Sequence, residues 1–511
     1  MDASFVDLVL PAFLHAFSQW YVILPAVVLG IVVGAIPGFS AANTIIILLP
    51  IALSVDVETG LVFMVALYCA SRMGAGIPAI LVNIPGTGGA AATPLDGYPM
   101  TQQGRAPQAL AMSFTASTFG GLFTTIIAIL ALPLLTQVVY YVHSVEMVVI
   151  MLFGMSLIAS IAAGDPLKGL IAGLFGMMLG AIGADHIYGT PRGTMGFLEL
   201  YDGLPIIPAL VGLFAVSEAF LIIEGKSIVT EKGRALMAQS GWGPTLEGVR
   251  MTFQRWWHVV WTSLIGLLIG VVPGAGAGIA AFTAYQQSRL YSRTPELYGT
   301  GHPEGLIAPE SANNGVTSGT LIPLLVLGLP GGLTAAVMMI VLQMHDVLLG
   351  PQLFAENPEL GYGVLVTMAV TYIFMIPVIL PLARYMSRIT LISTNYMAPV
   401  ILSFTLTGAY VARTYPFDMY LALAFGVIGY LARRTGFHVA AILIGCVLGP
   451  LLEQYLLRAM RISQGDWTVL FSSPIGNVLW VLLGITLAAP YWLEWWRARG
   501  RRKAETTAGS S

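Results

Sequence analysis

Apolar segments long enough to cross a bilayer recur along the whole chain. The clearer ones cover residues 20–36, 39–54, 59–82, 107–141, 145–163, 166–185, 205–224, 257–272, 361–383, 389–411, 415–432, 437–457 and 475–494. Inside a bilayer every backbone polar group must be satisfied within the protein, so such segments fold as helices or as buried re-entrant pieces. We therefore expect an all-α, polytopic transmembrane protein.

The composition excludes other classes of protein. Charged residues make up 9% of the 511 residues, hydrophobic residues 57%, and the mean hydropathy is +0.82. A soluble protein carries roughly 25% charged residues, so a large soluble enzyme is excluded. The formal net charge is −2, which provides no basic face for nucleic acid. The only cysteines, Cys69 and Cys446, lie in apolar stretches and are expected to be small core residues.

One polar stretch divides the chain. Residues 225–256 contain five basic side chains and are expected to form a cytoplasmic linker between a first transmembrane repeat, 1–224, and a second, 257–496. Residues 497–511 form a basic tail, which the positive-inside rule also places in the cytoplasm.

The two halves resemble each other in sequence. Residues 30–38 (GIVVGAIPG) match residues 266–274 (GLLIGVVPG) at an offset of 236. A second match follows at an offset of 245, between residues 74–91 and 319–336. It aligns Gly74, Ile77, Pro78, Pro85, Gly86, Ala90 and Ala91 with Gly319, Ile322, Pro323, Pro330, Gly331, Ala335 and Ala336. Two ordered matches at nearly constant offsets indicate a duplicated unit.

Charges indicate that the repeats have opposite orientations. The loop after the second motif of the first half carries Arg105, whereas the corresponding loop of the second half carries Asp346, Glu356 and Glu359. The first loop should face the cytoplasm and the second the outside. Inverted repeats with broken helices are a common plan for secondary transporters.

Pro-Gly pairs interrupt the apolar segments at matched positions. Each proline lacks an N–H and frees a carbonyl four residues earlier, and the following glycine lets the chain turn. Freed carbonyls at Pro37-Gly38 and Pro273-Gly274 could coordinate Na⁺. The alternative is that the prolines only kink helices, but two symmetric pairs of breaks favour a binding cavity.

Small polar residues surround these breaks. Amides and hydroxyls suit both substrate carboxylates and cations, although they also join helices in ordinary bundles. We expect substrate to be held by Asn43, Arg72, Asn83, Pro85, Gly86, Thr87, Asn313, Asn314, Ser318, Pro330 and Gly331. The candidates for ion coupling are Ser40, Thr93, Asp96, Glu310 and Thr317, of which Asp96 and Glu310 have a structural cap as their alternative role.

Arg72 is the unusual charge of this set, because it lies within an apolar segment. A charge inside a membrane span is costly and is a functional candidate by default. It could hold a substrate carboxylate through two parallel hydrogen bonds. The alternative is an ion pair with an internal acid such as Asp96 or Glu310.

The sequence lacks the common catalytic motifs. The chain has no His-Glu-x-x-His, Gly-x-Ser-x-Gly or Cys-x-x-Cys sequence, and Phe220 replaces the first glycine of a P-loop that Gly225-Lys226-Ser227 would end. We expect a protein that is not an enzyme and has no cofactor, so any pumping would use a gradient of Na⁺ or H⁺.

The motifs resemble the large membrane subunit of the bacterial tripartite tricarboxylate transporter family, from about Gly30 to Pro490. The best matches are Gly34-Ala-Ile-Pro37-Gly38, residues 80–86 (ILVNIPG) with 96–100 (DGYPM), 309–314 (PESANN) and 322–331 (IPLLVLGLPG). One departure is at Gly74-Ala-Gly76, where the family usually has Gly-Gly-Ser. This departure argues against assuming citrate as the substrate.

The resemblance implies a multi-pass permease of the bacterial inner membrane that imports carboxylates with Na⁺ or protons. It also implies two partners, a small four-helix membrane subunit and a periplasmic solute-binding protein. The alternative function is a passive carboxylate channel.

The predicted inversion of the repeats can be tested by cysteine labelling. With Cys69 and Cys446 replaced, Gln103→Cys should react with an impermeant thiol reagent only from the cytoplasmic side, and Asn357→Cys only from the outside. Reaction of both sites from the same side would rule out inverted repeats.

Overall fold

The computed structural model describes residues 5–36, 41–139, 141–162, 166–184, 189–224, 242–345, 347–386 and 394–485. The regular secondary structure of this part is helical, apart from one antiparallel pair, β1 (Gly183–Ala184) with β2 (Pro191–Arg192). The prediction of an all-α fold is therefore confirmed, apart from that two-residue pairing.

Fewer helices are long enough to cross a membrane than there are apolar segments. Among the described residues, five helical stretches meet the length and hydropathy of a span: Val57–Val82, Ala106–Gln137, Ile206–Glu224, Pro358–Tyr385 and Val439–Ile462. A bent pair, Val6–Ser18 with Trp20–Gly34 at 71°, would make a sixth. Several other segments form apolar helices of 10–17 residues. A multi-pass membrane protein is the class that these helices define.

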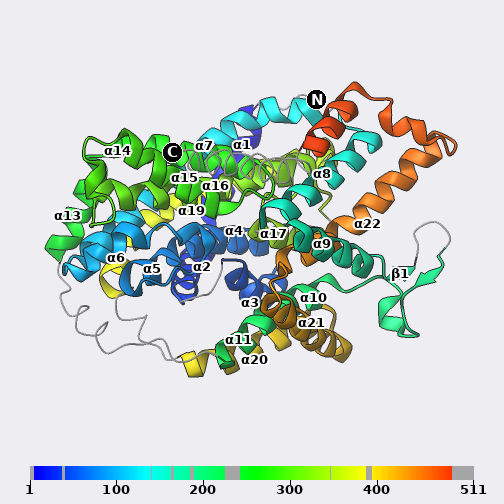
Figure 1. Ribbon diagram of the computed structural model, residues 1–511, viewed down its shortest axis with the longest axis horizontal. Helices are drawn as coiled ribbons and strands as arrows, with labels where there is room; N and C mark the ends of the chain where they lie inside the picture. Colours follow the sequence, from blue (N-terminus) through cyan, green and yellow to red (C-terminus); the bar gives the residue numbers. More distant parts are fainter. Residues whose placement is uncertain are drawn as a thin grey trace, which may run out of the picture. The chain divides into compact units, whose positions relative to one another are not determined.

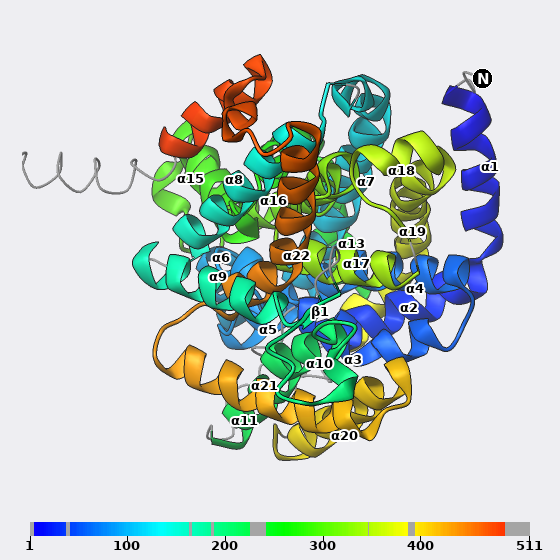
Figure 2. The same cartoon turned by 90° about the vertical axis from the view of Figure 1, so that its right-hand side faces the viewer.

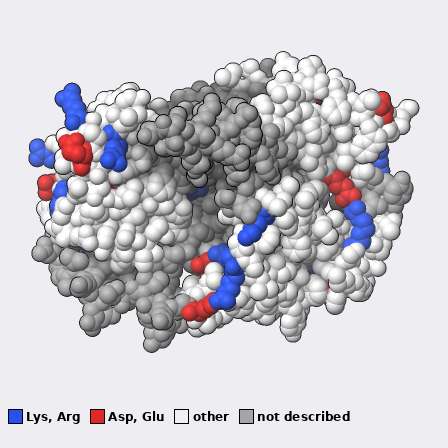
Figure 3. All heavy atoms as spheres, viewed as in Figure 1, with Lys and Arg blue, Asp and Glu red and all other residues white. Residues whose placement is uncertain are grey.

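The chain divides into two compact units, 1–140 with 205–431 and 141–204 with 432–511. The helices of the first unit are α1 (Phe5–Ser18), α2 (Trp20–Gly34), α3 (Ala41–Leu53), α4 (Val57–Gly74), α5 (Gly76–Val82), η1 (Gly88–Ala90), α6 (Pro94–Gln102), α7 (Ala106–Val139), α10 (Ile206–Val211), η3 (Gly212–Val216), α11 (Ser217–Glu224), α13 (Trp242–Phe253), α14 (Trp256–Val271), α15 (Gly276–Tyr291), η4 (Pro295–Leu297), α16 (Pro303–Leu327), α17 (Leu333–Met344), α18 (Pro351–Glu356), α19 (Pro358–Tyr385) and α20 (Thr394–Arg413), with α21 (Pro416–Arg434) at its end. Figure 1 shows α14, α15 and α16 lying together. Figure 3 shows how few charged side chains reach the face it displays.

The second unit contains α8 (Ser144–Ala162), α9 (Pro166–Gly180), the β1–β2 pair, η2 (Leu198–Leu200), α22 (Val439–Ile462) and η6 (Trp467–Phe471). Helices α9 and α22 lie side by side in Figure 2. They approach through glycines: a Cβ on Gly180 would lie 2.5 Å from the Cys446 carbonyl oxygen. Gly176 and Gly180 therefore form a helix-packing face.

The two sequence repeats pack internally in the same way. In the first, α2 lies against α4, where a Cβ on Gly34 would lie 2.5 Å from the Ser71 carbonyl oxygen. In the second, α14 lies against α16, where a Cβ on Gly270 would lie 2.9 Å from the carbonyl oxygen of Val316. Gly34 corresponds to Gly270 and Ser71 to Val316 at the two sequence offsets, so the duplication extends from sequence to helix packing.

The repeats also end their central helices in the same way. Asn83, with φ of 59°, follows α5, and Gly328, with φ of 70°, follows α16. The next residue in each case donates its N–H to a proline carbonyl: Ile84 to Pro78 at 3.2 Å, and Leu329 to Pro323 at 3.1 Å. This is the left-handed cap that commonly ends helices. Pro85 and Pro330 thus follow a completed helix end rather than break a helix from within, which corrects the sequence-based expectation for these two prolines.

Sequence patterns missed the helices that contribute most to the interior. Helices α15, α16 and α17 do not coincide with any expected apolar segment, although α16 is buried from Gly305 to Val326. Polar residues lower the hydropathy of α16, because its polar groups face other helices rather than lipid. In addition, the predicted linker contains a helix, α13, which packs on α7.

The matched glycine contacts predict a matched loss of stability. Gly34→Ala and Gly270→Ala should each lower stability by about 1–3 kcal/mol, because the added Cβ overlaps backbone atoms of the facing helix. The control is Gly363→Ala in α19, where a Cβ meets no atom within 4 Å. Thermal unfolding of the detergent-purified chain measures the effect. Equal melting temperatures for all three variants would contradict the account.

Candidate substrate site

Arg72 lies in the last turn of α4 with 8% of its surface exposed. Its Nη1 donates to Asn313 Oδ1 at 3.3 Å, and its Nη2 donates to the Tyr68 hydroxyl at 3.1 Å. The Tyr68 hydroxyl is hydrogen-bonded to Thr320 Oγ1 at 2.7 Å, so the guanidinium is linked to α16 directly through Asn313 and indirectly through Tyr68. All of these partners are neutral.

The Arg72 charge has no acidic partner among the described side chains. Its ion pair with Asp96 or Glu310, the alternative left open by the sequence, is not formed. The Nε atom is buried and makes no hydrogen bond. Since a guanidinium has five N–H donors, much of its hydrogen-bonding capacity is unused in this conformation.

Asn313 lies where the two repeats meet beside Arg72. Its Nδ2 donates to the Arg72 carbonyl oxygen at 3.4 Å, while its Oδ1 accepts from the guanidinium. A Cβ on Gly89, in η1, would overlap Asn313 Oδ1 and lie 2.8 Å from the Cβ of Ala277, in α15. The turn after Pro85 and the first turn of α15 therefore meet beside Arg72, and only a glycine at position 89 leaves room for the amide.

Glu310 lies one turn before Asn313 on α16 and is fully buried. Its carboxylate accepts hydrogen bonds from Thr93 Oγ1, from Ser113 Oγ at 2.9 Å and from Ser117 Oγ at 2.9 Å. The backbone of Gly76 closes the remaining side, since a Cβ there would lie 2.8 Å from Oε1. The two predicted ion-coupling residues Thr93 and Glu310 are thus in direct contact.

Asp96, also fully buried, performs a different task. Its Oδ1 accepts from the backbone N–H groups of Gly299, Gly301 and His302 at 2.7–2.9 Å, and its Oδ2 accepts from the Tyr285 hydroxyl at 3.0 Å. These contacts fix the loop that leads into α16. A structural cap, one of the two roles that the sequence allowed for Asp96, accounts for these four hydrogen bonds.

Aromatic and imidazole rings surround this loop. The His302 ring stacks on Tyr298 with their centroids 4.6 Å apart, and burial lowers the pKa of His302. Burial also raises the pKa of Tyr298 to about 12. Both side chains are therefore neutral near pH 7.

The other predicted residues are only partly brought together. Asn314 points to α19, where its Oδ1 accepts from the Tyr372 hydroxyl at 3.4 Å. Asn83 is exposed, and its left-handed backbone conformation caps the end of α5. Thr87 caps η1 by accepting from the Ala90 N–H. Asn43, Thr317 and Ser318 are buried, and Ser318 donates to the Gly315 carbonyl.

The Pro-Gly turns of the second repeat lie beside each other. Gly274, with φ of 81°, donates its N–H to the Gly331 carbonyl oxygen at 3.2 Å. A Cβ on Gly331 would lie 2.7 Å from the Thr320 Cα, as one on Gly86 would lie 3.1 Å from the equivalent Ala75 Cα. Three predicted residues, Pro37, Gly38 and Ser40, lie outside the described residues.

Several site residues were missed by sequence reasoning. Tyr68 precedes Arg72 by one helical turn, and Ser113 and Ser117 share one face of α7. Spacings of four residues on predicted helices were the available signal. Tyr285 and Tyr372 gave none, because their partners are 189 and 58 residues away in sequence.

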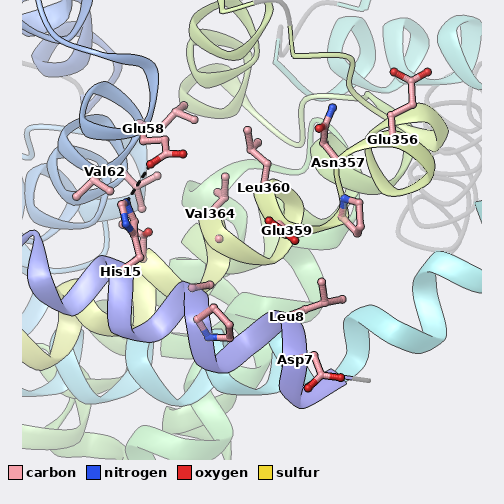
Figure 4. A pocket seen from close by; sticks show the side chains of 17 residues that line it. Asp7, Leu8, His15, Glu58, Val62, Glu356, Asn357, Glu359, Leu360 and Val364 are labelled. Atoms are coloured by element: carbon pink, nitrogen blue, oxygen red, sulfur yellow. Dashed lines mark ion pairs between the residues drawn. The ribbon is translucent and has the colours of Figure 1, made fainter. Parts of the chain in front are cut away.

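A pocket of about 640 Å³ lies elsewhere in the first unit, lined by α1, α4 and α19 (Figure 4). Its lining includes Asp7, Glu58, Glu356 and Glu359, and His15 pairs with Glu58 at 3.4 Å. None of its lining residues belongs to the Arg72 cluster. Its acidic character does not suit a carboxylate ligand.

Helices of spanning length, two similar sequence repeats and a buried arginine that joins them define a multi-pass membrane protein with a polar interior site. Residues 21–444 match the family model described as the tripartite tricarboxylate transporter TctA family. The chain therefore belongs to this family, whose name implies a system with further subunits.

Two relatives come from Agrobacterium vitis. The "Uncharacterized 52.8 kDa protein in TAR-I ttuC' 3'region" is 34% identical over 453 residues, 89% of each chain. The "Uncharacterized protein in TAR-II ttuC' 3'region" is 36% identical over 214 residues, which cover 42% of this chain and 88% of the relative. No solved structure matches the chain significantly.

The Asp96 contacts predict a large loss of stability on substitution. Asp96→Ala should lower stability by roughly 3 kcal/mol or more, because three backbone donors and one hydroxyl lose their acceptor. The control is Asp56→Ala, at the exposed N-cap of α4, which should cost about 1 kcal/mol. Thermal unfolding of both variants measures the two losses of stability. Equal losses would contradict the role of Asp96 as a structural cap.

Proposed function

We propose that this permease imports carboxylates across the bacterial inner membrane, driven by an ion gradient, and that Arg72 binds a carboxylate of the substrate. The observation that carries the proposal is a buried guanidinium whose described contacts are all neutral. An arginine at this depth is costly, and a substrate carboxylate would supply the missing counter-charge through paired hydrogen bonds.

The surroundings of Arg72 support an anion with several oxygen atoms. Asn313 adds an amide, and η1 with the first turn of α15 brings backbone close to that amide. Rearrangement of the Asn313 amide would free Nη1 for the ligand. We propose that substrate lies here, between the repeats, with Asn314, Thr87 and Ser318 around it.

Directional import would use inverted repeats that expose this site alternately to the two sides of the membrane. The matched packing of α2 on α4 and of α14 on α16 supports two structurally equivalent repeats. Delivery of substrate would require a periplasmic solute-binding protein, and the small four-helix membrane subunit would complete the permease. A passive channel is the second candidate; the tightly buried Arg72 cluster disfavours it, since an open pore needs a solvated path.

Arg72→Gln should reduce the affinity for carboxylate by roughly ten- to a hundredfold, because a charged pair of hydrogen bonds is lost. Arg72→Lys should rescue it only in part, since an ammonium lacks the planar fork. Uptake of labelled carboxylates into proteoliposomes containing all three subunits measures the half-saturating concentration.

The control is Arg255→Gln, at the start of α14, where Arg255 lies 3.8 Å from Glu304 and outside the Arg72 cluster. It should leave the half-saturating concentration unchanged. An Arg72→Gln permease with normal affinity would remove Arg72 from the binding site. Uptake that follows the substrate gradient alone, without any ion gradient, would favour the channel.

A further inference from the structure

The Glu310 carboxylate is a second buried charge that substrate binding alone does not use. It is fully buried, and hydroxyl groups from three positions converge on it: Thr93, Ser113 and Ser117. We infer that Glu310 is the proton-binding site of the permease and that the coupling ion is H⁺ rather than Na⁺. This inference rests on the proposed function, for which it names the ion and its ligand.

The packing around Glu310 favours a proton over a metal cation. A sodium ion needs a central space surrounded by several oxygen atoms. Here the hydroxyl oxygens lie at hydrogen-bond distance from the carboxylate itself, 2.9 Å for Ser113 and Ser117. The Gly76 backbone fills another side, since a Cβ there would lie 2.8 Å from Oε1 and 3.1 Å from Oε2. A proton needs no such space, because it forms an O–H bond on an existing oxygen.

Among the described residues, the side chains that hydrogen-bond to Glu310 are all hydroxyls, and none of them is an acid or a base. The segment before α6 presents Thr93, α7 presents Ser113 and Ser117, and α5 presents Gly76. The Asp96 carboxylate on α6 is bound to the loop before α16 and to Tyr285. On α4 the charged groups are Glu58 at the start of the helix, which pairs with His15, and Arg72, which contacts Asn313 of α16.

This arrangement couples proton binding to substrate binding. Glu310 and Asn313 are three residues apart on α16, hence on one helix face, so Glu310 lies one turn from the residue that holds Arg72. We infer that in the empty site the positive charge of Arg72, which contacts Asn313 one turn from Glu310, favours the ionised carboxylate. When a carboxylate binds Arg72, this effect is lost, and the proton affinity of Glu310 rises.

One proton taken from the outer solution would then form an O–H bond on Glu310. It would leave on the inner side after the substrate departs, when Arg72 again favours the ionised carboxylate. The hydroxyls of Ser113, Ser117 and Thr93 can rotate to accept from the protonated acid or to donate to the anion.

Infrared spectroscopy tests the proton site without any substrate. In pH-difference spectra of the purified full chain, the carbonyl stretch of a buried protonated carboxylic acid should grow as the pH falls and be absent in Glu310→Gln. It should persist in Glu304→Gln, a matched control on the same helix. Identical spectra for the wild type and Glu310→Gln would overturn the inference.

A second variant tests the proton site by infrared spectroscopy without replacing Glu310. Ser117→Ala removes one donor to the ionised carboxylate, so the band should titrate at higher pH than in the wild type. An unchanged or lower titration midpoint would overturn the proton site.

Transport provides the functional arm, with a panel of labelled mono-, di- and tricarboxylates as probes and all three subunits in proteoliposomes. For a carboxylate that the wild type takes up, an inward proton gradient should concentrate it without Na⁺, whereas Glu310→Gln should only exchange it across the membrane. Accumulation by Glu310→Gln, a requirement for Na⁺, or loss of exchange in Glu310→Gln would each contradict the inference. Wild type that takes up none of the probes would contradict the proposed function, while the infrared result would still decide the proton site.

Discussion

A buried charge must be compensated within the protein, and this constraint organises the centre of the molecule. Arg72 and Glu310 are both at least nine-tenths buried, and each is surrounded by neutral hydrogen-bonding groups rather than by the other. Direct pairing would neutralise both charges in every state. In the proposed function and the inferred proton site, their separation leaves each available to a mobile ligand, a carboxylate for Arg72 and a proton for Glu310.

The fold holds these groups through close helix contacts. Glycines bring α2 onto α4 and α14 onto α16, so the two helices that carry Arg72 and Glu310 are each supported by an equivalent partner. Left-handed caps then end α5 and α16 and turn the chain back into the interior. Asp96 fixes the loop before α16 and thereby the position of Glu310 and Asn313 along that helix. Helices α4 and α19 also line the acidic pocket, up to Val65 on α4 and Thr367 on α19, but neither Tyr68 nor Tyr372 belongs to its lining.

Much of this arrangement could be predicted from the sequence, because duplication and proline leave local signals. The matched motifs indicated the two sequence repeats, and the isolated charge of Arg72 marked the candidate site. The buried helix α16 was missed because its polar side chains lower its hydropathy below that of a lipid-facing span. These side chains are buried against other parts of the protein. The contacts of Glu310 with Ser113 and Ser117 join residues almost 200 positions apart, and no local pattern specifies such a pairing.

The central claim, that Arg72 binds the substrate, is tested most directly by determining the structure of the complete permease with a transported carboxylate bound. The account predicts a carboxylate group within hydrogen-bond distance of the Arg72 guanidinium, with the Asn313 amide displaced from Nη1. A carboxylate bound elsewhere, with the contacts of Arg72 to Tyr68 and Asn313 intact, would contradict it.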